Sequence, residues 1–279
     1  MSIALFHNAS YQCSRAVTRQ YSTSFASAIR LLHFDLRTPI YNIYGMVRLA
    51  DEIVDTFHDH DKEQLLADFK RQTFEAIDQK ISLNPILQAF QITVNKYNID
   101  AALIESFFNS MESDLTKKEY DHDAYREYIY GSAEVVGLMC LYVFCEGENQ
   151  KYQALQASAR ALGAAFQKVN FLRDIRADFN DLSRMYFPNC NFLNFTAADK
   201  LEIEREIEQD FTDAFVGIRN LPLKARFGVY VAYKYYYSLF KKIKSAEPSQ
   251  IMQQRFRIGN HQKAFILFRA GVKMQLKML

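Results

Sequence analysis

Two aspartates spaced four residues apart, with an arginine close by, occur at two places in the chain. The first pair is Asp51 and Asp55, and Arg48 and Tyr44 precede it at spacings of three and four. On a helix all four residues lie on one face, because side chains three and four positions apart are neighbours. Carboxylates at this spacing repel each other and destabilise an isolated helix by about 0.2–0.5 kcal/mol. The pattern therefore predicts a cation between them.

A second face contains Gln167, Asn170, Asp174 and Asp178 at spacings of three, four and four, with Arg173 beside it. Mg²⁺ prefers oxygen ligands and usually binds one or two carboxylates together with phosphate oxygens of a substrate. Two such faces across a helical cavity would hold Mg²⁺ ions that in turn hold a diphosphate. A single aspartate pair is more often a solvated helix face. Two pairs, each with an arginine and an amide or tyrosine, favour the metal site.

The composition predicts that helices carry both faces. The 279 residues are 49% apolar but include only nine glycines and five prolines, roughly half or less of the usual ~7% and ~5%. Sandwiches and barrels built from strands need more of both. Apolar residues here recur every three or four positions, so we expect an all-α fold. The sequence shows no repeat, low-complexity segment or linker, which favours one domain over residues 1–279.

Charge and apolar content exclude several classes of protein. Lys and Arg number 34 against 32 Asp and Glu, a net charge of +2, so bulk charge predicts no nucleic-acid partner. The apolar content argues against a disordered chain. The four cysteines form no C-x-x-C motif and are typical of reduced thiols in a cytosolic protein. The chain starts with no secretory signal, and its longest apolar run, Val135–Cys145, is shorter than the ~18–20 residues of a membrane span. We therefore expect a cytoplasmic protein.

Prolines predict where helices begin and end, and small residues predict where they pack closely. We expect nine or ten helices, one of them from Thr38-Pro39 to about Thr56 and another starting at Asn84-Pro85. Leu221-Pro222 separates two further helices. The stretch at 157–165, rich in alanine and glycine, predicts a close contact between helices.

Five blocks of the sequence, taken in order, resemble the squalene and phytoene synthases, the head-to-head prenyl transferases. The blocks are Tyr21–Phe25 (YSTSF), Ile43–Asp55 (IYGMVRLADEIVD), Tyr128–Gly137 (YIYGSAEVVG), Gln167–Asp178 (QKVNFLRDIRAD) and Arg184–Pro188 (RMYFP). Either aspartate motif alone is a weak signal, whereas five ordered blocks are specific. The likeness covers nearly the whole chain and is greatest to bacterial phytoene synthases.

The resemblance implies a single-domain, all-helical isoprenoid-synthase fold (class I terpenoid synthase) with a central cavity. It also implies roles for individual residues. The residues that would coordinate Mg²⁺, with Mn²⁺ as the alternative metal, are Asp51, Asp55, Asn170, Asp174 and Asp178. Those that would contact the diphosphates, besides Asn170, are Ser22, Ser24, Arg48, Arg173, Arg184, Tyr186 and Arg255. Those that would line the reaction centre with Arg48 are Tyr44, Tyr128, Gln167 and Tyr236. Those that would shape the apolar channel are Phe25, Ile29, Val135 and Leu138.

The implied reaction is the Mg²⁺-dependent condensation of two geranylgeranyl diphosphates to phytoene. It passes through a cyclopropylcarbinyl (prephytoene) diphosphate, needs no NADPH, and is the first committed step of carotenoid biosynthesis. The alternative is a squalene, dehydrosqualene or hydroxysqualene synthase acting on farnesyl diphosphate, because channel length decides the substrate and a sequence does not give that length. A third alternative, an inactive helical scaffold or assembly factor, would be marked by loss of the aspartates, which are intact here.

The same resemblance implies partners. Because the implied substrates and products are hydrophobic, we expect transient contact with the inner face of the membrane and transfer of the product to a carotenoid desaturase. The C-terminal segment Lys263–Leu279 mixes basic with apolar residues and could lie on a bilayer. A final helix packed on the core is the alternative for this segment.

Overall fold

The protein is built from helices throughout the part that the computed structural model describes, which is residues 2–117, 119–181, 184–188, 190 and 195–276, without the side chains of 177–181. These residues form thirteen α-helices and one π-helical turn, and their sole β-feature is an isolated bridge between Glu119 and Met185. The expected all-α fold is therefore confirmed, whereas the expected number of nine or ten helices is too low.

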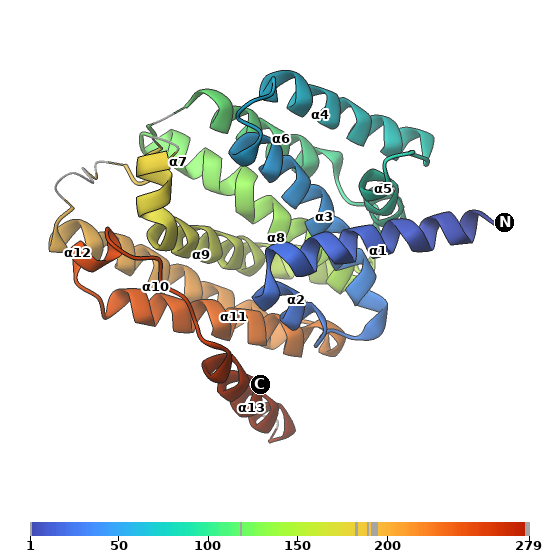
Figure 1. The fold of residues 1–279 in the computed structure, drawn as a ribbon. Helices are drawn as coiled ribbons and strands as arrows, with labels where there is room; N and C mark the ends of the chain where they lie inside the picture. The colour runs from blue at the N-terminus through green and yellow to red at the C-terminus, as the bar shows by residue number, and fades with distance from the viewer. Residues whose placement is uncertain (1, 118, 182–183, 189, 191–194, 277–279) are drawn as a thin grey trace.

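The helices follow one another in the order drawn in Figure 1. Their bounds are α1 Ile3–Tyr21, α2 Thr23–Ile29, α3 Phe34–Thr56, α4 Lys62–Gln79, α5 Pro85–Tyr97, α6 Ala101–Thr116, α7 His122–Ile129, the π-helical turn η1 Tyr130–Glu134, α8 Val135–Cys145, α9 Asn149–Asp181, α10 Ala197–Asn220, α11 Leu223–Lys244, α12 Pro248–Ile251 and α13 Asn260–Gln275.

Helix ends follow the proline prediction at two places and depart from it at a third. Asn84 caps α5 by accepting from the backbone N–H groups of Ile86 and Leu87, and Leu221-Pro222 separates α10 from α11. Helix α3, however, begins at Phe34 and carries Pro39 inside its second turn. The backbone N–H of His33 donates to the carbonyl of Lys224 at 2.9 Å. This long-range contact holds the start of α3 and has no local sequence signal.

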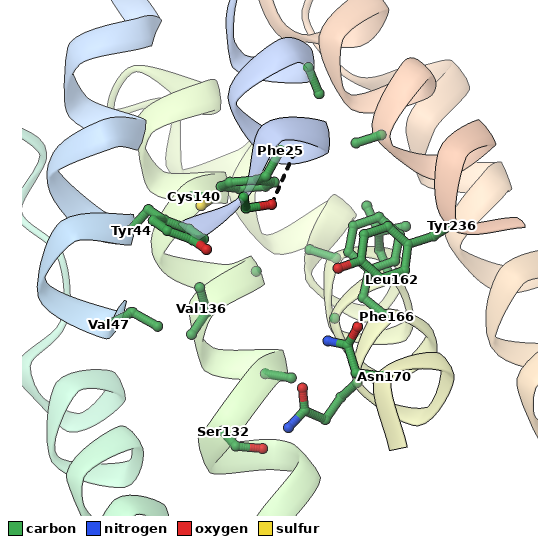
Figure 2. Close-up of a pocket in the computed structure, with 18 of the residues that line it drawn as sticks. Phe25, Tyr44, Val47, Ser132, Val136, Cys140, Leu162, Phe166, Asn170 and Tyr236 are labelled. Atoms are coloured by element: carbon green, nitrogen blue, oxygen red, sulfur yellow. Dashed lines mark hydrogen bonds between the residues drawn. The ribbon is translucent and has the colours of Figure 1, made fainter. Parts of the chain in front are cut away.

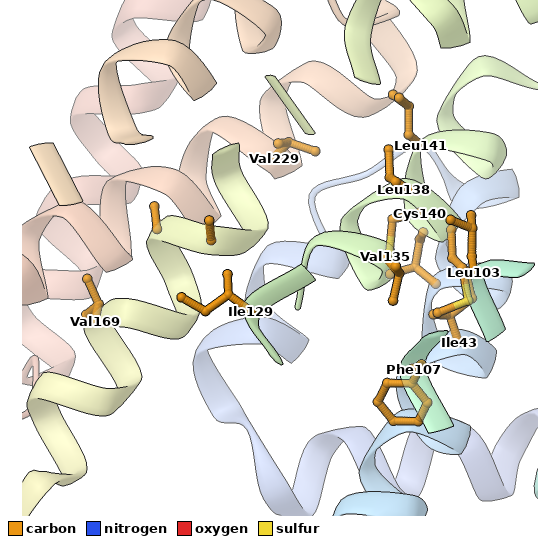
Figure 3. Packing of buried hydrophobic residues seen from close by; sticks show 14 of the residues in the cluster. Ile43, Leu103, Phe107, Ile129, Val135, Leu138, Cys140, Leu141, Val169 and Val229 are labelled. Atoms are coloured by element: carbon orange, nitrogen blue, oxygen red, sulfur yellow. The ribbon is translucent and has the colours of Figure 1, made fainter. Parts of the chain in front are cut away.

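Helix α8 lies at the centre of the bundle, in contact with α3, α6 and α9 (Figure 1). Helices α10 and α11 pack on α9, and α1 and α5 pack on α3. The buried apolar side chains of these layers form one hydrophobic cluster. In Figure 3, Val135 and Leu138 of α8 lie in this cluster beside Ile43 and Leu103.

Glycines allow α8 and α9 to approach closely. A Cβ atom on Gly163 would lie 2.6 Å from the carbonyl oxygen of Ala133, and one on Gly137 would lie 2.8 Å from that of Ala159. Real Cβ atoms essentially never come within 3.0 Å of another heavy atom in this way. The close helix contact predicted for residues 157–165 is confirmed.

The segment from α7 through η1 to α8 is one continuous helix with a widened turn in its middle. His122–Cys145 is long and apolar enough to cross a membrane, because it contains an 18-residue window with a mean hydropathy of 1.5. More than half of that window is buried inside the bundle. Its apolar character is that of a central core helix, and π-helical turns of the kind found at η1 occur frequently at functional sites.

Candidate active site

A cavity of about 600 Å³ opens between α2, α3, α8, α9 and α11. Figure 2 shows Tyr44 and Val47 of α3 on one side of it, Phe166 and Asn170 of α9 with Tyr236 of α11 on the other, and α8 behind. One end is lined by aspartates and arginines, and the other by apolar and small side chains. The central cavity implied by the family resemblance is therefore present.

The charged end of the cavity, here called the mouth, combines the two acidic helix faces predicted from the sequence. Asp51 and Asp55 line it from α3, and Asn170 and Asp174 line it from α9. Asp178 lies on the last turns of α9, but its side chain is outside the described residues. The helical spacing thus brings four of the five predicted metal-binding residues to one cavity.

Arginines neutralise these carboxylates one by one. Arg48 donates to Asp51 at 2.7 Å, and Arg184 donates to Asp55 at 2.9 Å. Asp174 has two partners, its neighbour Arg173 and, at 2.7 Å, Arg255 from the segment between α12 and α13. All four arginines line the cavity. Since arginine binds phosphate oxygens as well as carboxylates, the pairs of the more exposed Arg48, Arg173 and Arg255 are exchangeable.

A further carboxylate at the mouth, that of Asp114 of α6, was not predicted from the sequence. It lines the cavity with its side chain only 3% exposed, and the hydroxyl of Tyr128 donates to it at 2.6 Å. The hydroxyls of Tyr120 and Tyr186 lie 3.4 Å from its other oxygen. Arg184 donates to its backbone carbonyl at 2.9 Å. Asp114 therefore holds Tyr128, Tyr186 and Arg184 in place.

Burial changes the proton affinities at the mouth. The Asp51 side chain is 36% exposed because it faces the cavity, yet desolvation and the neighbouring Asp55 raise its pKa to about 7. Burial raises the pKa of Asp114 to about 6 and that of Tyr44 to about 12. Burial and the nearby Asp114 carboxylate raise the pKa of Tyr128 far above its ordinary value. Both phenols are therefore protonated at neutral pH and act as hydrogen-bond donors.

Aromatic rings form the next part of the wall. Phe25 packs on Tyr44 with ring centroids 5.0 Å apart, and Phe166 stacks on Tyr236 at 3.9 Å. In Figure 2 the hydroxyls of Tyr44 and Tyr236 point into the space between these two pairs. Gln167 lines the same part of the cavity. The residues predicted for the reaction centre thus converge on one place, although Phe166 had not been predicted.

Beyond the rings the cavity is apolar, and here two predicted channel residues are wrong. Val135 and Leu138 do not line the cavity but are buried in the hydrophobic cluster. The α8 side chains that line it instead are those of Val136, Cys140, Leu141 and Phe144. In a regular helix Val135 would lie seven residues beyond Tyr128 on the same face. The π-helical turn between them contains one extra residue, so that Val136 takes this position.

Among the predicted residues of α2, Ser22, Phe25 and Ile29 line the cavity and Ser24 does not. Ser22 is the residue before the helix, and its hydroxyl accepts from the backbone N–H of Phe25 at 3.3 Å. Ser24 lies two positions further, which turns its side chain away from the face that carries Phe25 and Ile29. The assignment of Ser24 to a phosphate contact is therefore not supported by its position.

The oxygen atoms at the mouth fit a hard divalent cation shared with a phosphorylated substrate. Among the described residues, no three His, Cys, Asp or Glu side chains converge closely enough to hold an ion by themselves. The Oδ1 atom of Asn170 is buried and has no hydrogen-bond partner within the described part of the chain, and the same holds for the hydroxyl of Ser132 on η1. Buried oxygens normally have a partner. An amide oxygen that lines the same cavity as Asp51 and Asp55 is suited to a cation such as Mg²⁺, which takes its remaining ligands from water and phosphate.

Comparison with known proteins gives consistent results. A family model described as squalene/phytoene synthase matches residues 18–262. Phytoene synthase of Arthrospira platensis is 27% identical over 272 residues, covering 88% of each chain. The 4,4'-diapophytoene synthase of Staphylococcus haemolyticus is 25% identical over 204 residues, covering 70% of this chain and 68% of the relative. The crystal structure of a dehydrosqualene synthase in complex with a ligand superposes with a TM-score of 0.83, at 18% identity, over 96% of this chain and 98% of that one.

Proposed function

The chain belongs to the squalene/phytoene synthase family, and from this premise we propose that it is a phytoene synthase, which joins two geranylgeranyl diphosphates head to head. The observation that carries the proposal is the cavity itself. Its mouth gathers four described carboxylates, the amide of Asn170 and several arginines, and its other end is apolar. A molecule with a diphosphate head and a hydrocarbon tail fits this division.

The arginines at the mouth would bind the diphosphate. Arg48, Arg173 and Arg255 each donate to an aspartate and would transfer these hydrogen bonds to phosphate oxygens when the substrate enters. Arg184, only 6% exposed, would remain on Asp55 and Asp114 and hold α3 and α6 together. The arginines thereby place positive charge against the negative charge that develops on the diphosphate as the C–O bond breaks, which stabilises the leaving group.

Mg²⁺ would be held by Asp51 and Asp55 on one side and by Asn170 and Asp174 on the other, with Mn²⁺ as the alternative. When bound, the metal supplies Lewis-acid neutralisation of the departing diphosphate.

The aromatic and apolar walls would protect the allylic cation that ionisation creates. The ring faces of Phe25, Phe166 and Tyr236 lie beside the mouth, and aromatic faces attract a cation. A double bond of the second prenyl chain attacks this cation, and loss of a first proton to the released diphosphate closes the ring of the cyclopropylcarbinyl diphosphate. A second ionisation, rearrangement and loss of a proton then give the conjugated triene. Water, which would trap the cation as an alcohol, is excluded by the apolar wall.

The released diphosphate is the best acceptor for the final proton. Tyr44 and Tyr128 are the other groups near the reaction centre, but a phenol that already carries its proton at neutral pH cannot take another. The raised pKa values of both tyrosines therefore favour a role for them in orienting the phosphate by donating hydrogen bonds.

Two features support the longer substrate. The phytoene synthase of Arthrospira platensis aligns over more of the chain than the diapophytoene synthase of Staphylococcus haemolyticus. The apolar wall also includes small side chains, among them Ala28, Ala159 and Ala214, which leave room for a chain to extend. The second candidate is a synthase that acts on farnesyl diphosphate, favoured by the fold shared with a dehydrosqualene synthase.

The test is a product assay with purified protein and Mg²⁺, offered farnesyl or geranylgeranyl diphosphate, each with and without NADPH. We expect a forty-carbon triene, which absorbs in the near ultraviolet, from geranylgeranyl diphosphate without NADPH. A thirty-carbon product from farnesyl diphosphate would assign the chain to the second candidate. No product from either substrate would overturn the enzyme assignment and leave a helical scaffold.

A further inference from the structure

The charge of the chain is distributed very unevenly. Residues 223–279 contain twelve Lys and Arg but only one acidic residue, Glu247, whereas the preceding 222 residues contain 22 basic and 31 acidic residues. The near-zero net charge of the whole chain hides this division. The basic part comprises α11, α12 and α13.

Helix α13 carries an apolar stripe that faces solvent. Phe265, Phe268, Val272 and Leu276 follow one another at spacings of three, four and four, and they are 59%, 70%, 39% and 63% exposed. The opposite side of the helix, around the buried Ala270, packs on α11. Figure 1 shows α13 projecting from the bundle beside α11. The exposed stripe is therefore additional to the face that anchors the helix.

Basic side chains gather beside this stripe. Lys234 of α11 lies near Lys241 of the same helix and near Arg269 and Lys273 of α13, and together with burial these three neighbours lower the pKa of Lys234. None of the four forms an ion pair with a described carboxylate, in contrast to Lys224 and Lys244 elsewhere on α11. Lys234 instead lies 5.4–5.7 Å from the ring centroids of Tyr230, Tyr233 and Tyr237. Such a cluster is costly unless an anionic partner covers it.

The surface lies next to the mouth of the cavity. The Lys263 ammonium of α13 donates to the hydroxyl of Thr23 at 3.4 Å, and the adjacent Tyr21 and Ser22 line the cavity. Arg255, which precedes α13, also lines it. A partner bound along α13 would thus reach the opening through which the cavity is filled.

We propose that α13 and the adjoining face of α11 form a docking surface for a lipid bilayer with anionic headgroups. Phe265, Phe268, Val272 and Leu276 enter the boundary between headgroups and acyl chains, while Arg269 and Lys273 bind lipid phosphates. A helix with an apolar stripe flanked by Lys and Arg binds in this way, and each basic residue near an anionic membrane strengthens the attraction. A second copy of the chain would bring an equally positive surface, so that charge opposes self-association here. The docking does not depend on the reaction proposed above.

The experiment is flotation of the full chain with vesicles of phosphatidylcholine alone or with equal parts of phosphatidylglycerol. We expect flotation with the phosphatidylglycerol vesicles only, and release as salt shortens the Debye length below about 8 Å. Exchange of both phenylalanines (F265S/F268S), or reversal of both charges (R269E/K273E), should weaken partition at least roughly tenfold. Leu83→Ser, which removes an apolar side chain that is 93% exposed elsewhere, should leave partition unchanged.

Two controls keep the test decisive. The variants should keep the far-ultraviolet circular dichroism and melting temperature of the wild type, because the exchanged side chains are on the surface. Absence of flotation with phosphatidylglycerol vesicles, or equal flotation of wild type and F265S/F268S, would overturn the proposal. So would a wild-type dimer that F265S/F268S converts to a monomer, since a second copy would then occupy the stripe.

Discussion

At the mouth of the cavity the described aspartates are all paired with arginine, whereas the opposite end has few polar groups and much exposed hydrocarbon surface. Directional, charge-assisted hydrogen bonds fix the side chains at the mouth. At the apolar end, only the shape of the walls restricts what can bind. The difference implies that residues at the mouth decide whether the reaction occurs, and residues at the apolar end decide on which chain length.

The largest effect should follow from removing one carboxylate at the mouth. We expect Asp51→Asn or Asp174→Asn to lower turnover by roughly 10²–10³-fold, the size of loss seen when one stabilising group is removed from a reacting site. The fold should remain, because the amide relieves repulsion between neighbouring carboxylates. Product formation and melting temperature check both parts. Asp78→Asn, on the exposed face of α4, is the matched control, and near-normal turnover in both variants would remove the metal assignment.

The next effect concerns Asp114, which joins the mouth to α6. Asp114→Ala leaves the hydroxyl of Tyr128 without its acceptor and removes one of the two carboxylates beside the buried Arg184. The free energy of unfolding should fall by about 3 kcal/mol. Asp114→Asn keeps an acceptor oxygen and should lose clearly less. Urea denaturation compares the two variants, and equal small losses would show that Asp114 does not hold the cluster together.

A change at the apolar end should alter the product and leave the chemistry intact. Phe25→Trp and Ile29→Trp fill space in the cavity, so the accepted prenyl chain should become shorter and thirty-carbon product should exceed forty-carbon product. Chromatography of products from an equal mixture of both substrates measures this ratio. Leu138→Met serves as control, because Leu138 faces the core. An unchanged ratio in both Trp variants would exclude these residues from the channel.

The smallest effect is the pH dependence of stability without metal. Burial raises the pKa of Asp51 from 3.8 to about 7 and that of Asp114 to about 6, so the folded chain holds protons that the unfolded chain releases. The free energy of unfolding should therefore fall as pH rises from about 4 to 7, and the melting temperature should fall by a few degrees. Asp210, whose pKa burial raises to about 6, adds an effect of the same sign.

Melting curves at several pH values with a chelator check this last expectation. Asp51→Asn should flatten the dependence, because the amide does not titrate, and the wild-type slope minus the variant slope isolates Asp51. Equal slopes for the wild type and Asp51→Asn would show that Asp51 titrates in the folded chain as an ordinary surface carboxylate.

The two acidic helix faces at the mouth could be predicted from the sequence because each depends only on residue spacing within one helix. Asp51 and Asp55, and likewise Asn170 and Asp174, share a face through helical spacing alone. Asp114 could not be found in this way, since it is a single aspartate on α6 whose role comes from Tyr128, Tyr186 and Arg184, residues distant in the sequence. Long-range packing, rather than spacing, brings them together.

The residues of the apolar wall were predicted less well, because the backbone of the central helix departs from regular α-helical winding. Val135 and Leu138 belong to the right segment but to its opposite face, because the periodicity of a regular helix does not include the π-helical turn. Nothing in the composition of Tyr130–Glu134 distinguishes it from an α-helical turn. Its Gly131, where a Cβ would lie 2.0 Å from the hydroxyl oxygen of Ser110, is explained only by the packed structure.

The widened turn at η1 also determines where the chain can change in length. Deletion of one residue within Tyr130–Glu134 would restore regular helical winding and leave α8 in phase with α7, so that Val136 and Cys140 would still face the cavity. Deletion of one residue inside α8 would instead rotate everything after it by about 100° and turn Cys140 and Phe144 away. Along this central helix, natural insertions and deletions are therefore expected to concentrate at η1. There the number of residues can change without changing which α8 side chains line the cavity.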